Sequence, residues 1–188
     1  MKKFSIEFKW AAIATLFALI WMFIVKALGF HDIEKIRFVV GLDLLFNLVL
    51  ILFYYACLRQ KKNDYFHGVA TWQQIFLSGL VLCVMITFFF PLIQYITYNQ
   101  VSPYFIDTLY EALATQTKMG IEEAQKNASF DLFLRNGVTN NLSFGVVTVA
   151  ILAYFLKTKD GSELKKSASS KAEVVKVKRR KNKTINRF

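Results

Sequence analysis

The chain has 188 residues, of which 55% are hydrophobic and 19 are phenylalanine, and its formal net charge at pH 7 is +11. This composition is too apolar for an ordinary soluble domain, so much of the surface is expected to face lipid. The sequence therefore argues against a soluble enzyme.

Four apolar stretches follow one another along the chain, at about residues 10–28, 36–58, 72–98 and 138–156. Each is long enough to cross a bilayer core, which takes about 20 residues of helix. No cleavage pattern of small residues closes the first stretch, so we interpret it as a retained helix rather than a secretory signal. The predicted fold is all-α: a bundle of four transmembrane helices formed by residues 1–157.

Lysine and arginine collect in three of the segments that flank these stretches, and such charges resist translocation. They occur before the first stretch, in the second connection and after Leu156, whereas the third connection is mostly acidic. We therefore predict that both termini are cytoplasmic. The basic residues of the first two segments are Lys2, Lys3, Lys9, Arg59, Lys61 and Lys62.

Polar side chains inside the spans are costly in lipid. Asp43 and Asn47 lie four residues apart, on one face of the second span. On the third span, Thr87 and Gln94 share a face with Pro91, which is expected to kink the helix. These residues predict an intramembrane polar niche in which Asp43 titrates or binds a cation. The alternative is a set of interhelical hydrogen bonds that only hold the bundle together.

Small residues form a stripe on the first span and another on the fourth. Such stripes let helices approach closely in lipid, either within one bundle or between subunits. The two stripes consist of Ala11, Thr15 and Ala18, and of Asn141, Gly145 and Thr148.

Residue types that carry catalysis or bind metals are not grouped in the sequence. Cys57 and Cys83 belong to no Cys/His cluster, and His31 and His67 fall in connections predicted on opposite sides of the membrane. The common catalytic and phosphate-binding motifs do not occur. We therefore expect no enzyme activity, no cofactor and no metal.

The third connection, residues 99–136, is too long for a simple turn. Ile106, Leu109 and Leu113 share one helical face, which predicts an outer amphipathic helix that extends the third span or lies along the membrane surface. Gly120 is expected to weaken it midway. Such a helix would serve as a partner site or simply be solvated.

Residues 158–188 are predicted to form a disordered, polybasic cytoplasmic tail. Next to a membrane, such a cluster attracts anionic lipids. Nucleic acid is the alternative phosphate partner, but the tail lacks the interleaved aromatic residues of a stacking reader. The expected contacts are Lys176, Lys178, Arg179, Arg180, Lys181 and Lys183.

The second connection and third span carry a recognisable layout. A basic loop is followed by Gly68, by Thr71-Trp72-Gln73-Gln74 and by Gly79, and Pro91 precedes the acidic third connection. From Phe4 to Lys157 this resembles a bacterial membrane family catalogued as domain of unknown function 4199, known mainly from Bacteroidetes. The resemblance implies a four-helix protein of the bacterial inner membrane and no particular activity.

Two functional hypotheses follow. The first is a non-enzymatic accessory or scaffold component that packs against other membrane proteins. The second is a small oligomeric transporter, or a proton- or cation-coupling unit, that uses the niche around Asp43. We favour the first, because one four-helix chain without an internal repeat offers little room for alternating access.

Overall fold

The computed structural model describes residues 3–117 and 120–158. Within them, four helical segments are long and apolar enough to cross a membrane, which confirms the predicted all-α fold. The predicted lipid-binding tail lies outside the described residues, apart from Thr158. The four segments are α1 (Ser5–Ala27), α2 (Val39–Gln60) with short helical turns η1 (Ile36–Phe38) before it and η2 (Lys61–Tyr65) after it, α3 (Trp72–Ile96) with η3 (Thr97–Val101) after it, and α6 (Phe130–Leu156).

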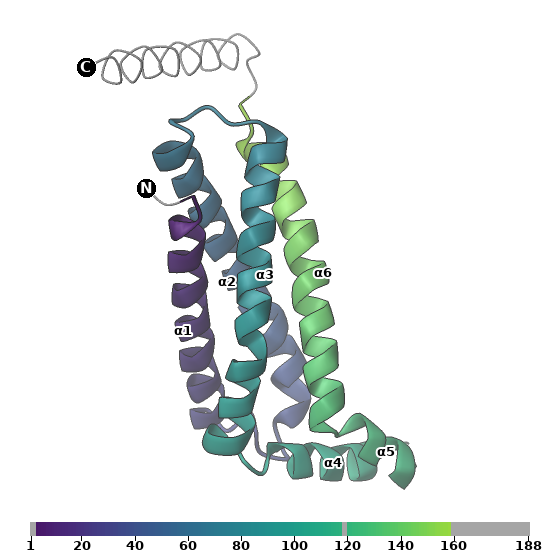
Figure 1. Ribbon diagram of the computed structural model, residues 1–188. Helices are drawn as coiled ribbons and strands as arrows, with labels where there is room; N and C mark the ends of the chain where they lie inside the picture. Colours follow the sequence, from purple (N-terminus) through teal and green to yellow (C-terminus); the bar gives the residue numbers. More distant parts are fainter. Residues whose placement is uncertain (1–2, 118–119, 159–188) are drawn as a thin grey trace, which may run out of the picture.

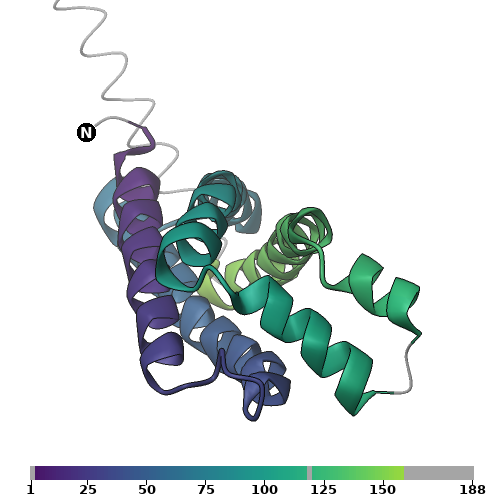
Figure 2. The same cartoon turned by 90° about the horizontal axis from the view of Figure 1, so that it is seen from below.

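The closest packing in the bundle is between α3 and α6 and between α1 and α3, while α2 completes it by contacting α1 and α6 (Figures 1 and 2). Glycine makes the α3–α6 approach possible. A Cβ at Gly79 would lie 2.2 Å from a methyl carbon of Val149, and one at Gly145 would lie 2.3 Å from the Cys83 sulfur. The backbones of α3 and α6 can therefore approach this closely only because Gly79 and Gly145 have no side chain.

The segment before α3 is held by polar contacts at the start of the helix. Thr71 and Gln74 form a capping box, in which each side chain accepts a hydrogen bond from the other residue's backbone N–H. Trp72 stacks on Phe76, with ring centroids 4.6 Å apart, and its indole N–H donates to the carbonyl of Ala150 on α6. These contacts explain why Thr71-Trp72-Gln73-Gln74 opens the third span.

The connection between α3 and α6 contains two helices rather than one, α4 (Phe105–Gln116) and α5 (Ile121–Asn127), with Gly120 between them. They lie across one end of the bundle (Figures 1 and 2). The apolar side of α4 packs on the bundle through Phe105 and Ala112. Whether this layer lies along the membrane surface stays a prediction.

The helix that contains the fourth apolar stretch begins at Phe130, before the stretch itself, and Ser129 caps it by accepting a hydrogen bond from the N–H of Leu132. The apolar stretch marked only the part of the helix suited to lipid, whereas the helix itself includes polar residues before it. The start of α1 and the end of α6 lie at the opposite end from α4 and α5 (Figure 1).

Candidate functional site: a polar cavity and a buried ion pair

A cavity of about 590 Å³ lies in the half of the bundle near α4 and α5. Three of the four predicted niche residues line it: Asp43 and Asn47 from α2 and Gln94 from α3. We name it the Asp43 cavity. Its wall also includes three amides from α6 that were not predicted to belong to the niche: Asn136, Asn140 and Asn141, the last of which was predicted only as part of a small-residue stripe.

Thr87, the fourth predicted residue, is buried but does not line the cavity. It precedes Gln94 by about two helical turns, or roughly 10 Å, so it lies deeper in the bundle on the same face of α3. Pro91 lies between them inside α3, which continues as a helix to Ile96. The predicted kink at Pro91 stays a prediction.

The lining of the Asp43 cavity contains one carboxylate, that of Asp43, and one imidazole, that of His31, but no lysine or arginine among the described residues. In the part of the chain that the structure describes, no hydrogen bond or ion pair joins the Asp43 carboxylate to another residue. Several buried polar atoms of the lining also lack a described partner: the Trp21 indole nitrogen, both ring nitrogens of His31 and the Gln94 side-chain oxygen.

His31 enters the cavity wall from the connection between α1 and α2. It is 5% exposed, and its ring centroid lies 4.7 Å from that of Phe105 on α4. Burial lowers the pKa of His31 below its usual 6.5, and the charge of Lys26 lowers it further, while Asp32 opposes both effects. The imidazole is therefore neutral near pH 7.

Aromatic rings supply much of the remaining wall. Tyr98 and Phe105 also line the cavity and stack on each other, with ring centroids 4.9 Å apart. The cavity therefore combines a large apolar surface with a few polar groups and one carboxylate. The other aromatic lining residues are Trp21, Phe46, Phe90, Phe133 and Phe144.

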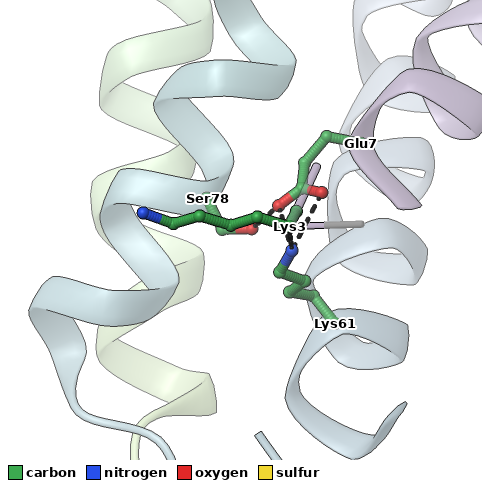
Figure 3. A network of polar contacts seen from close by, with 4 residues as sticks. All are labelled: Lys3, Glu7, Lys61 and Ser78. Carbon is green, nitrogen blue, oxygen red and sulfur yellow. Dashed lines mark hydrogen bonds and ion pairs between the residues drawn. The ribbon is translucent and has the colours of Figure 1, made fainter. Parts of the chain in front are cut away.

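A second polar group lies at the opposite end of the bundle, where α1 begins (Figure 3). The Lys61 ammonium is 2.9 Å from one carboxylate oxygen of Glu7 and 3.0 Å from the other. Ser78 on α3 donates a hydrogen bond to the same carboxylate, and Lys61 donates to the backbone carbonyl of Lys3. Glu7 is 0% exposed and Lys61 is 2% exposed, so this Glu7–Lys61 network is fully buried.

Aromatic rings cover the cation of the network. The Lys61 ammonium lies 4.2 Å from the ring centroid of Tyr65 and 5.7 Å from that of Phe4. The network joins α1, η2 and α3, and every charged group in it has a partner of opposite charge or a hydrogen bond.

This network was not predicted from the sequence, where Lys61 indicates only a charge that sets the orientation of the chain. The one available signal was Glu7, an isolated acidic residue in a flank that otherwise carries Lys2, Lys3 and Lys9. Pairing it with Lys61 required knowing that η2 carries the lysine side chain back toward α1.

The fold defines a class: a protein of four helices able to span a membrane, with a polar cavity between them. Residues 9–158 match the model of a family described as "Protein of unknown function (DUF4199)". The chain belongs to this family, as its resemblance predicted. Neither a curated protein nor a solved structure matches the chain.

Proposed function

We propose that the protein is a non-enzymatic accessory or scaffold component of the bacterial inner membrane, with both termini in the cytoplasm. The distribution of charge supports this orientation. Lys3, Lys9 and Lys62 belong to the end where α1 begins and α6 ends, whereas Glu111 and Glu122 belong to α4 and α5 at the other end (Figure 1). Positively charged flanks favour the cytoplasmic side.

The observation that carries the accessory role is that the Asp43 cavity occupies only one half of the bundle. The other half is filled by a core in which Tyr54, Cys57, Leu82, Cys83 and Val149 are buried. A transporter must offer its site to both sides of the membrane in turn. The packed half contains the close contacts at Gly79 and Gly145 and the buried Glu7–Lys61 ion pair. Such a tightly packed region suits a protein that supports other membrane components.

Co-purification tests this role. The full chain and a version ending at Lys157 are isolated from native membranes in mild detergent, and their partners are identified by quantitative mass spectrometry. We expect stoichiometric membrane-protein partners with the full chain, and their loss on truncation would assign recognition to the basic tail. A homo-oligomer without other proteins would contradict the accessory role.

The second candidate is a small oligomeric transporter or a proton- or cation-coupling unit, and the cavity itself favours it, because Asp43, Asn47 and Gln94 share one space. Ion flux in reconstituted vesicles separates the two. A coupling unit should lose ion-dependent flux in Asp43→Asn, while Asp107→Asn on α4 provides a control at an exposed carboxylate. We expect no flux that depends on Asp43.

A further inference from the structure

We propose that the Asp43 cavity binds a protonated organic amine, with the ammonium group at Asp43 and an apolar body against the aromatic wall. This goes beyond the accessory role, because the cavity can hold a ligand whether or not the protein has partners. The size fits a small molecule, since 590 Å³ lies within the usual range of about 300–1,000 Å³ for ligand pockets. A single metal ion would leave most of the space unfilled.

The charge of the lining selects a cation. Asp43 is its one carboxylate, no lysine or arginine lines it among the described residues, and His31 is neutral near pH 7. An anion placed here would face Asp43 without a compensating charge. Asp43 lines the cavity, is exposed in the structure and has no described partner, so its carboxylate is available to a bound cation.

The polar atoms favour a cation that carries N–H groups. The Gln94 side-chain oxygen is buried, accepts no described hydrogen bond and lines the same cavity as Asp43. Asn47, one turn from Asp43 on α2, adds a further amide oxygen. A protonated amine has N–H donors for these acceptors, whereas a quaternary ammonium has none.

The aromatic wall suits both parts of such a ligand. Aromatic faces attract cations through their quadrupole, and rings also cover apolar bodies. Trp21 and Phe46 reach the cavity from α1 and α2, and Phe90 and Phe144 reach it from α3 and α6. An amine of this kind has two sources: a free molecule, or the ethanolamine headgroup of a phospholipid.

Isothermal titration calorimetry tests the site with 2-phenylethylamine as the probe. The full chain is placed in nanodiscs made only of phosphatidylglycerol, and empty nanodiscs provide the baseline for partition into lipid. We expect saturable binding that Asp43→Asn weakens by about tenfold or more, because the variant leaves the cation without its counter-charge. The neutral probe 2-phenylethanol should bind wild type more weakly by a similar factor.

Two matched variants keep the test decisive. Asp107→Asn removes an exposed carboxylate on α4 and should leave the affinity unchanged, while Asp43→Glu keeps the charge and should retain most of it. Each variant is first checked for a monodisperse elution profile. Equal affinity of wild type and Asp43→Asn, or equal binding of the amine and the alcohol, would overturn the proposal.

Adding phosphatidylethanolamine to the nanodiscs identifies the source of the amine. A fall in the apparent affinity of the probe on wild type that exceeds the fall caused by the same fraction of phosphatidylcholine shows that the ethanolamine headgroup competes for the site, and equal falls assign it to a free amine. A failure of co-purification would remove the accessory role and leave this result untouched, so the two proposals fail separately.

Discussion

The two ends of the bundle treat their polar groups differently. Where α1 begins, the Glu7 carboxylate is bound by both Lys61 and Ser78, so the two buried charges are paired. In the half near α4 and α5, His31 and Gln94 have buried polar atoms with no described partner. Both regions place polar groups among apolar helices. A satisfied network supports the fold, while the polar groups around the cavity are those that the proposed ligand would contact.

The largest effect is expected from breaking the satisfied network. Lys61→Met leaves the Glu7 carboxylate buried without its cation, which should destabilise the protein by about 3–5 kcal/mol. The measurement is the loss of helical circular dichroism on thermal unfolding in detergent micelles. Lys62→Met, at the neighbouring half-buried lysine, should change the unfolding temperature little.

A double variant sharpens this prediction. Glu7→Leu combined with Lys61→Met removes both charges, so most of the lost stability should return. If the double variant were as unstable as Lys61→Met alone, the cost would come from packing rather than from an unpaired charge.

The next largest loss of stability is expected from disturbing the close contact between α3 and α6, in the half of the bundle without the cavity. Gly145→Ala places a Cβ 2.3 Å from the Cys83 sulfur and 2.7 Å from the Tyr54 hydroxyl oxygen, so overpacking should cost about 1–3 kcal/mol. Gly41→Ala on α2 is the matched control, since nothing lies within 4 Å of its added Cβ. Equal unfolding temperatures of the two variants would contradict the tight α3–α6 contact.

In the cavity half, His31 should make stability depend on pH. Its pKa is lowered in the folded protein, so below about pH 6.5 the unfolded state binds a proton that the folded state does not. Stability should therefore fall as the pH decreases through this range, by at most about 1.4 kcal/mol per pH unit.

The His31→Phe variant should show a flatter dependence between pH 7 and pH 5, measured as unfolding temperature against pH. His67→Asn is the control, because His67 is exposed and has a positive φ of 56° that asparagine tolerates. Equal slopes for wild type and His31→Phe would mean that the imidazole is not kept neutral by its surroundings.

The smallest effect is expected at the start of α3. Thr71→Ala removes the side-chain half of the capping box and should cost about 1 kcal/mol, while Thr71→Ser keeps the hydroxyl and should cost less. Thermal unfolding of the two variants checks this. A loss as large as that of Lys61→Met would mean that the cap, and not the ion pair, dominates the stability of this end.

The four long helices and three of the residues that line the cavity could be predicted from the sequence. Long apolar runs mark membrane helices directly, and spacing by four placed Asp43 and Asn47 on one face. The position of each residue along its helix axis was harder to predict. Thr87 shares the face of Gln94 but lies beyond the cavity. Asn136 was missed because it precedes the apolar stretch, and Asn140 and Asn141 lie inside that stretch but were not assigned to the niche, which was sought only on the second and third spans.

The Glu7–Lys61 network was beyond sequence reasoning for a different reason. Its two charges are separated by 54 residues and both lie next to predicted spans, where charges ordinarily face water. Only the packing of α1, η2 and α3 brings them together and excludes solvent.

The contrast between the two halves is tested most directly by comparing Asp43→Asn with Glu7→Gln in two assays, thermal unfolding and calorimetric binding of 2-phenylethylamine in phosphatidylglycerol nanodiscs. We predict that Asp43→Asn loses amine binding but unfolds at the same temperature as wild type. Glu7→Gln should unfold at a lower temperature than wild type, and it should still bind the amine at temperatures where it is folded. An Asp43→Asn protein that bound the amine like wild type but unfolded as early as Glu7→Gln would contradict the assignment of the cavity as a ligand site.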